Sequence, residues 1–186
     1  MPAQSERVRL ATPADRAPVV ATVVAAFEHD PAFRLFFAAD AFTEQAALFV
    51  GALFDRRVAR QAVWVVDDGA GVAMWEPPGG PTDDDVDVLP DDARARLGAW
   101  DSAVHHLMPT EPHWYLGILA THPSHAGQGL AKLAAAPGLA TATGAGLSCW
   151  LETATAANVA MYERRGWTVV GAVEVDGVTC TVMRTP

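Results

Sequence analysis

The stretch at residues 126–131 reads Ala126-Gly127-Gln128-Gly129-Leu130-Ala131. It follows a mostly apolar run at residues 113–121, which predicts a buried strand, and it opens a helical pattern at residues 130–143. Glycines in such a turn let the backbone approach a ligand closely, and the N–H groups at a helix start point at anions. A pyrophosphate is the natural ligand of this turn. It matches neither of the two common phosphate-binding motifs, because it has no G-x-G-x-x-G and no Gly-Lys-Ser/Thr.

The elements after the turn alternate between strand and helix. Residues 147–153 form a second apolar strand pattern, and residues 156–164 predict a short helix. A strand, a helix and a second strand in succession predict that the two strands pair in parallel. A hairpin at residues 167–183 follows, and its Asp176-Gly177 turn is typical of a type I′ turn.

The first half predicts helices and an antiparallel hairpin. Thr12 as N-cap, Pro13 in the first turn and Asp15 at the third position indicate a helix start. We expect strands at residues 7–11, 62–66 and 72–75, and helices at residues 19–27, 43–60 and 90–107. The predicted fold is α/β (α+β), with a single domain over residues 1–186. Its central sheet is mixed and mostly antiparallel, with helices on both faces.

Three further features follow a family pattern in the same order as the glycine turn. They are the strand 116–121 with His122-Pro123, the strand end Leu151-Glu152-Thr153, and the run from Asn158 through Tyr162 to Gly166-Trp167. Together they resemble the GNAT superfamily of N-acetyltransferases, whose motifs are Gln/Arg-x-x-Gly-x-Gly/Ala and Asn-x-x-x-Tyr-Glu-Arg-x-Gly-Phe. The resemblance implies a sheet splayed between two parallel strands. It also implies acetyl-CoA as co-substrate.

Within the superfamily the chain is most similar to the puromycin N-acetyltransferase branch. The likeness includes residues 8–12, 63–70 and 137–138, and it is looser after Phe33 in the first half. It therefore supports a shared chemistry more strongly than a shared acceptor. Two departures stand out. Ala126 replaces the Gln or Arg of the motif, and Pro137 should kink or end the helix that follows the turn.

The resemblance assigns the cofactor contacts residue by residue. It implies that backbone groups of Leu119 and Thr121 hold the pantetheine arm and that Asn158 contacts the cofactor's lower arm. It assigns the pyrophosphate to the turn, residues Gly127, Gln128, Gly129, Leu130 and Ala131. Acetyl transfer in the family is direct, so the amine attacks the thioester while both are bound.

Such a reaction needs one group to accept a proton and another to donate one. Tyr162 suits the donor, because a phenol of pKa about 10 stays protonated at neutral pH. It lies four residues after Asn158, on the same helix face. Glu152 is the candidate general base, although a salt bridge or cap contact is an equal alternative. Further candidates for the base are Glu111, His105, His106 and His113.

Three aromatic residues are candidates for the acceptor pocket, since their rings offer broad flat contacts. They are Trp75, Trp114 and Tyr115, and at strand spacing they are equally well explained as core residues. The five histidines from His105 to His125 predict no structural zinc, because no pair has i,i+4 spacing or a C-x-x-C partner. Cys149 and Cys180 are expected as small core residues on strands.

The charge and hydrophobicity of the sequence indicate which classes of partner the protein can bind and where it is expected to lie in the cell. With 13 basic and 22 acidic residues the net charge is −9, which disfavours nucleic acid and favours cationic partners. No apolar run is long enough for a membrane helix, and the N-terminus lacks the apolar core of a secretory signal, so we expect a cytoplasmic protein. The oligomeric state is left open, a homodimer included.

The leading hypothesis is therefore an acetyl-CoA-dependent N-acetyltransferase for a small-molecule amine, with an aminonucleoside antibiotic such as puromycin as one candidate acceptor. The alternatives are an acetyltransferase for another metabolite or for a protein amine, and a non-catalytic acetyl-CoA sensor. Tyr162 argues against the sensor, whereas Ala126 leaves it open.

Overall fold

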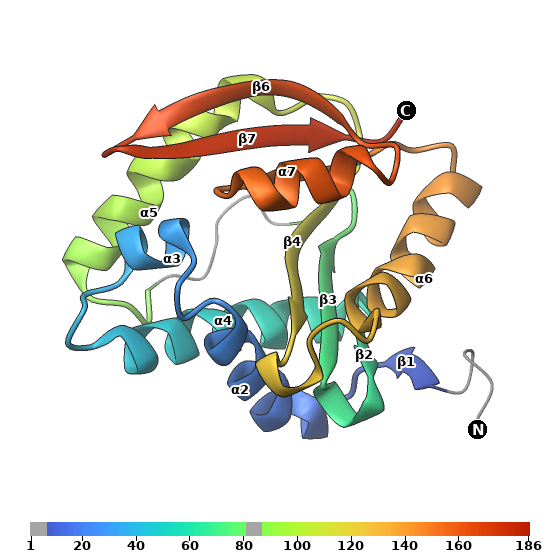
Figure 1. Ribbon diagram of the computed structural model, residues 1–186, viewed down its shortest axis with the longest axis horizontal. Helices are drawn as coiled ribbons and strands as arrows, with labels where there is room; N and C mark the ends of the chain where they lie inside the picture. Colours follow the sequence, from blue (N-terminus) through green and yellow to red (C-terminus); the bar gives the residue numbers. More distant parts are fainter. Residues whose placement is uncertain (1–6, 81–86) are drawn as a thin grey trace.

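The computed structural model describes residues 7–80 and 87–186. These residues form a seven-stranded sheet with helices packed on it (Figure 1). Its strands are β1 (Val8–Leu10), β2 (Val63–Val66), β3 (Gly71–Glu76), β4 (Trp114–Thr121), β5 (Cys149–Thr153), β6 (Thr168–Val175) and β7 (Val178–Arg184). The strand order is β1-β2-β3-β4-β5-β7-β6, and only β4 and β5 pair in parallel. The expected mixed, mostly antiparallel sheet is confirmed.

Helices cover both faces of the sheet and enclose two apolar cores. The helices are α2 (Arg16–Ala26), α3 (Pro31–Phe36), α4 (Phe42–Ala59), α5 (Asp91–Val104), α6 (Leu130–Gly144) and α7 (Ala156–Glu163). Residues of α2, α3, α4 and α5 form one core with the sheet, and residues of α6 and α7 form the other. No helix among the described residues has the length and apolar character that a membrane crossing needs.

Several local sequence signals are confirmed. Thr12 and Asp15 form the capping box that precedes α2, and Pro13 stands in its first turn. The β6–β7 hairpin turns at Asp176 and Gly177, whose φ angles of 46° and 81° are both positive, as a type I′ turn requires. Cys149 and Cys180 are free and buried in strands.

A bulge in β4 sets up the functional region. Met74 pairs with Ile118 and Trp75 pairs with Leu116, which leaves Gly117 as an extra residue. One extra residue reverses the faces of the residues that follow. Leu116 accordingly lies in the core beneath α6, whereas Ile118 lies in the core beneath α2–α5.

The parallel strands diverge at this bulge. Only Trp114 and Tyr115 of β4 pair with β5, opposite Cys149 and Trp150, although β4 continues to Thr121. Figure 1 shows β4 running beside β3. The expected splay is confirmed, and among the described residues no pairing of β4 with β5 is found beyond Tyr115.

Pro137 was expected to kink or end its helix, and it does not end it. The helix α6 continues through Pro137 to Gly144, and the side chain of Thr141 donates a hydrogen bond of 2.9 Å to the carbonyl of Pro137. Packing outweighs the lost donor, because Ala134, Ala135 and Gly138 are buried against the sheet. Gly138 allows a close approach: a Cβ there would lie 2.4 Å from the ring of Trp75.

Candidate active site

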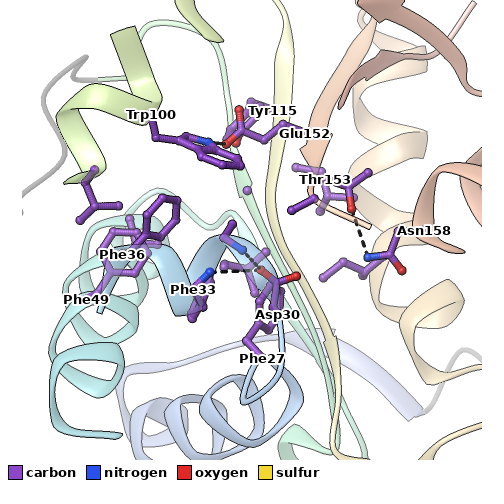
Figure 2. Close-up of a pocket in the computed structure, with 18 of the residues that line it drawn as sticks. Phe27, Asp30, Phe33, Phe36, Phe49, Trp100, Tyr115, Glu152, Thr153 and Asn158 are labelled. Atoms are coloured by element: carbon purple, nitrogen blue, oxygen red, sulfur yellow. Dashed lines mark hydrogen bonds between the residues drawn. The ribbon is translucent and has the colours of Figure 1, made fainter. Parts of the chain in front are cut away.

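A narrow cavity of about 130 Å³ lies at the splay between β4 and β5 (Figure 2). Its lining comes from segments far apart in sequence: the end of α2, α3, α4, α5, β4, β5 and α7. Leu119, Glu152, Asn158 and Tyr162, all predicted site residues, line it together with Tyr115. The splay and the two cores therefore bring distant candidates into one place.

One wall is formed by the end of β5 and the helix α7. Thr155 caps α7 by accepting a hydrogen bond from the backbone N–H of Asn158 at 3.3 Å. The side-chain amide of Asn158 donates to Oγ1 of Thr153 at 3.1 Å, as Figure 2 shows. This bond holds α7 against β5 and orients Asn158 at the cavity.

Tyr162 follows one turn later on α7 and is almost buried, with 8% of its surface exposed. Its ring packs edge-on against Trp167 at a centroid distance of 5.6 Å. Burial raises the pKa of the Tyr162 phenol to about 12, and the charge of Arg165 opposes the shift only in part. The phenol therefore keeps its proton throughout the physiological pH range, as a proton donor must.

Glu152 is held by an indole. The Nε1–H of Trp100 on α5 donates a hydrogen bond of 2.6 Å to Oε1 of Glu152. Trp100 is 2% exposed and packs edge-on against Phe36, with ring centroids 5.2 Å apart. Packing therefore fixes the indole of Trp100, and the hydrogen bond from this indole holds Oε1 of Glu152 in place.

The opposite wall is aromatic. Phe27, Phe33, Phe36 and Phe49 line the cavity from the end of α2, from α3 and from α4. Asp30 lies among them and caps α3, because its Oδ1 accepts from the backbone N–H groups of Ala32 at 2.9 Å and Phe33 at 3.2 Å. Figure 2 shows this carboxylate beside the rings of Phe27 and Phe33. Burial raises the pKa of Asp30, and the two backbone hydrogen bonds offset the shift only in part.

A wider cleft of about 600 Å³ adjoins the narrow cavity, and the two share Arg57, Asp101, Tyr115 and Glu152 as lining residues. Three of the alternative bases, His105, Glu111 and His113, line the wider cleft but not the narrow cavity. The fourth, His106, lines neither. Nδ1 of His113 also lies 2.8 Å from the carbonyl of Glu111. Among the base candidates, only Glu152 reaches the splay.

Arg57 is the cation at the junction of the two cavities. It is 4% exposed, and its Nε donates to Oε2 of Glu76 at 3.2 Å. Gly117 makes room for it, because a Cβ there would lie 2.8 Å from an Arg57 guanidinium nitrogen. The same glycine thus provides the bulge of β4 and the space for the guanidinium.

The glycine turn lies just beyond the end of β4, and its backbone fits an anion. Gly127 and Gly129 have φ angles of 78° and 75°, in the region that favours glycine. Leu130, Ala131 and Lys132 form the first turn of α6, where N–H groups have no intrahelical acceptor. No hydrogen bond from these three backbone groups is found within residues 7–80 and 87–186. The N–H of Gln128 is partly engaged, since it lies 3.4 Å from the carbonyl of His125.

The three aromatic candidates for the acceptor pocket lie in different places. Tyr115 lines both cavities. Trp75 is fully buried and Trp114 is 9% exposed, and their rings meet edge-on in the core beneath α6, at a centroid distance of 6.1 Å. Neither tryptophan lines the narrow cavity or the wider cleft. Both are core residues, which is the alternative that their spacing in the strands predicted equally well.

Sequence reasoning missed the aromatic wall, Asp30 and Trp100. The sequence has an aromatic cluster at residues 33–37 and, just before it, an Asp30-Pro31 pair that is also typical of a helix break. An Asp before a helix-initiating Pro signals an N-cap, and the aromatic residues after it signal a helix that packs on something. Neither signal indicates which part of the chain lies opposite.

Comparison with known proteins adds two findings. The profile of the Acetyltransferase (GNAT) family matches residues 23–167 of this chain. A crystal structure from Corynebacterium glutamicum, described as histone acetyltransferase HPA2 and related acetyltransferase, is similar with a TM-score of 0.68 and 26% identity. The match covers 97% of this chain and 95% of that one.

Two structures with lower sequence identity share the fold. An N-acetyltransferase from Staphylococcus aureus Mu50 has a TM-score of 0.64 at 17% identity, over 96% of this chain and 99% of that one. The C-terminal condensation domain of Ebony, in complex with beta-alanyl-dopamine, has a TM-score of 0.73 at 11% identity, over 96% and 97%. At these identities the likeness concerns the arrangement of elements alone.

Proposed function

The chain belongs to the GNAT family of acetyltransferases, and on that premise we propose that it transfers the acetyl group of acetyl-CoA directly to the amine of a small molecule. The observation that carries the proposal is the splay of β4 from β5. A narrow cavity opens there, a turn with anion-binding geometry follows the end of β4, and a buried phenol stands at the cavity wall.

The residues around the splay fit acetyl-CoA. The backbone of Leu119 and Thr121 follows the bulge, where β4 has no pairing with β5, and is available to hydrogen-bond the pantetheine amides. The turn from Gly127 to Ala131 offers N–H groups to the pyrophosphate at the start of a 15-residue helix with no acidic residue in its first turn. The bound cofactor supplies an acetyl thioester.

Ala126 weakens this site less than its position in the motif implies. The cradle consists of backbone groups whose directions depend on the φ angles of Gly127 and Gly129, and not on a side chain at residue 126. Lys132 stands in the first helical turn, is exposed, and adds a positive charge beside the same N–H groups.

Two side chains divide the proton transfers. Glu152, held by Trp100, accepts the proton of the acceptor's ammonium directly or through water. As the C–S bond breaks, Tyr162 donates its phenolic proton to the thiolate sulfur, and the second proton that leaves the amine nitrogen as the amide forms returns to the phenolate directly or through water; the raised pKa keeps the phenol protonated until then. Asn158 orients the cofactor arm beside Tyr162 from the same helix face.

The acceptor is a small molecule in this proposal because the amine must reach a cavity of about 130 Å³. The resemblance to the puromycin N-acetyltransferase branch makes an aminonucleoside one candidate. The Corynebacterium glutamicum relative is described as a histone acetyltransferase, which keeps a protein amine as the alternative acceptor.

The test is thiol release from acetyl-CoA by the purified protein with a panel of amines that includes puromycin, 2-phenylethylamine and a lysine-containing histone-tail peptide. We expect release with at least one small amine and a product that carries one added acetyl group. Release with the peptide alone would replace the small molecule by a protein acceptor. Tight acetyl-CoA binding without release with any amine would support the sensor instead.

A further inference from the structure

Only one of the two carboxylate oxygens of Asp30 accepts hydrogen bonds from the fold. Its Oδ1 accepts both capping hydrogen bonds, from Ala32 and from Phe33. Within residues 7–80 and 87–186, no hydrogen bond to Oδ2 and no ion pair of Asp30 with a Lys, Arg or His is found. The second oxygen is therefore available to a ligand in the cavity that Asp30 lines.

The other carboxylates nearby differ in this respect. Glu152 and Asp101 line the same cavity and both have partners, the indole of Trp100 in the case of Glu152, and Glu76 is surrounded by Arg56, Arg57 and Arg60. A carboxylate that is taken out of water without a cation is unfavourable, because its charge loses hydration and gains no counter-charge. Burial raises the pKa of Asp30 for this reason. A cationic ligand would supply the missing counter-charge.

The surroundings of Asp30 indicate which cation. The rings of Phe27 and Phe33 lie beside it with centroids 4.4 Å apart, and Phe36 and Phe49 continue the apolar wall. Aromatic faces attract an organic ammonium and bury the group attached to it. No group of three or more His, Cys, Asp or Glu side chains that could hold a metal ion is found within residues 7–80 and 87–186, and the aromatic wall favours an ammonium that carries an apolar substituent.

We propose that Asp30 is the carboxylate that binds the ammonium of the acceptor, and that the acceptor carries an aryl or alkyl group next to its primary amine. The inference rests on the proposed function, because it names the substrate class of the same cavity. Asp30 is a binding residue in this assignment, whereas proton removal stays with Glu152.

Asp30→Asn is the discriminating variant. Asparagine is as good an N-cap as aspartate, and its Oδ1 can still accept from Ala32 and Phe33, so the variant loses the charge and keeps the cap. Asp55→Asn is the matched control. It also removes one negative charge, but from an exposed ion pair with Arg16 that does not line the cavity. We expect both variants to unfold at the urea concentration of the wild type.

The experiment is calorimetric titration at pH 7 of 2-phenylethylamine and of 2-phenylethanol, a neutral probe of nearly the same shape, in the absence of acetyl-CoA. We expect the wild type and Asp55→Asn to bind the amine about 10- to 100-fold more tightly than the alcohol, as a charge-assisted hydrogen bond would provide. We expect Asp30→Asn to bind the two probes equally.

Two results would overturn the inference: an unchanged preference for the amine in Asp30→Asn, or a wild type that does not prefer the amine or binds neither probe. Because this titration requires no turnover, it separates the two proposals. An Asp30-dependent preference without thiol release would retain Asp30 as an ammonium site and refute the acetyltransferase. Thiol release without that preference would support the acetyltransferase and refute Asp30 as the ammonium site.

Discussion

Single side chains in this protein owe their roles to neighbours that lie far away in sequence. Trp100 and Glu152 are 52 residues apart, yet they share a hydrogen bond of 2.6 Å at the cavity. Sequence analysis predicts a helix at residues 90–107 that includes Trp100, and it identifies Glu152 as a candidate base near a strand end, but it does not predict that the two side chains meet. Which oxygen meets which donor depends on how α5 lies against the splay, and no local pattern carries that information.

The bond from Trp100 gives a prediction about catalysis. Trp100→Phe keeps an aromatic ring against Phe36 but removes the donor, so Glu152 loses its fixed orientation. We expect kcat to fall about tenfold while the KM for acetyl-CoA stays unchanged, since one hydrogen bond to a charged group is lost. Steady-state kinetics at saturating amine measure both constants.

Trp150→Phe is the control for that variant. It removes an indole hydrogen bond of 3.0 Å to Ser148, and Trp150 lines neither cavity. An equal fall of kcat in both variants would indicate a general packing effect and would refute the positioning role of Trp100.

At the scale of elements, the sequence predicted what local signals encode. The capping box at Thr12, the Asp176-Gly177 turn and the glycine turn depend on neighbouring residues, and the structure has each of them. The bulge at Gly117 was not predicted, because residues 113–121 read as a regular strand. The helix end that was one expected effect of Pro137 does not occur for a related reason: the packing of α6 on the sheet outweighs the local signal of the proline.

The glycine turn gives a prediction about cofactor binding. In Gly129→Ala the φ of 75° becomes costly by about 1–2 kcal/mol, so the turn relaxes and the N–H groups of Leu130 and Ala131 change direction. We expect the Kd for acetyl-CoA to rise about tenfold in a calorimetric titration. Gly146→Ala carries the same strain, at a φ of 69° just beyond the far end of α6, and should bind acetyl-CoA like the wild type. Equal affinity in Gly129→Ala would remove the turn from the cofactor site.

The capping box gives a prediction about stability and pH. Asp15 accepts bidentate hydrogen bonds from Arg9 at 2.7 and 2.8 Å and one from the N–H of Thr12 at 2.7 Å, and the bonds from Arg9 lower its pKa most. A lowered folded-state pKa stabilises the protein above the unfolded value near pH 4, and this contribution is lost as the pH falls further.

Asp15→Asn should therefore lower the free energy of unfolding at pH 7 by about 1–2 kcal/mol. The difference from the wild type should shrink below pH 4. Urea unfolding at pH 7 and at pH 3 measures it, with Asp55→Asn as a control in which an exposed pair changes the stability by less than about 0.5 kcal/mol. A difference that grows on acidification would contradict the assigned direction.

For the whole molecule, the two halves of the chain meet at the splay. The second half supplies β4, the glycine turn, β5 and α7, which follow in this order with α6 between the turn and β5, and its candidate site residues were predicted from ordered motifs. The aromatic wall comes from the end of α2, from α3 and from α4, and Trp100 comes from α5, so the proposed acceptor side is built from contacts between distant segments. Of the three aromatic residues that were predicted for that side, Trp75 and Trp114 pack beneath α6, whereas Tyr115 lines both cavities.

The central claim is acetyl transfer from acetyl-CoA to an amine at the splay, with Tyr162 as proton donor. The most direct measurement is the rate of thiol release at saturating acetyl-CoA and saturating amine, for the wild type and for Tyr162→Phe. Phenylalanine keeps the ring against Trp167 and removes only the hydroxyl. We predict a kcat lower by about 100-fold or more in the variant, with an unchanged KM for acetyl-CoA. Equal rates in the two proteins, or a wild type that releases no thiol with any amine, would contradict the claim.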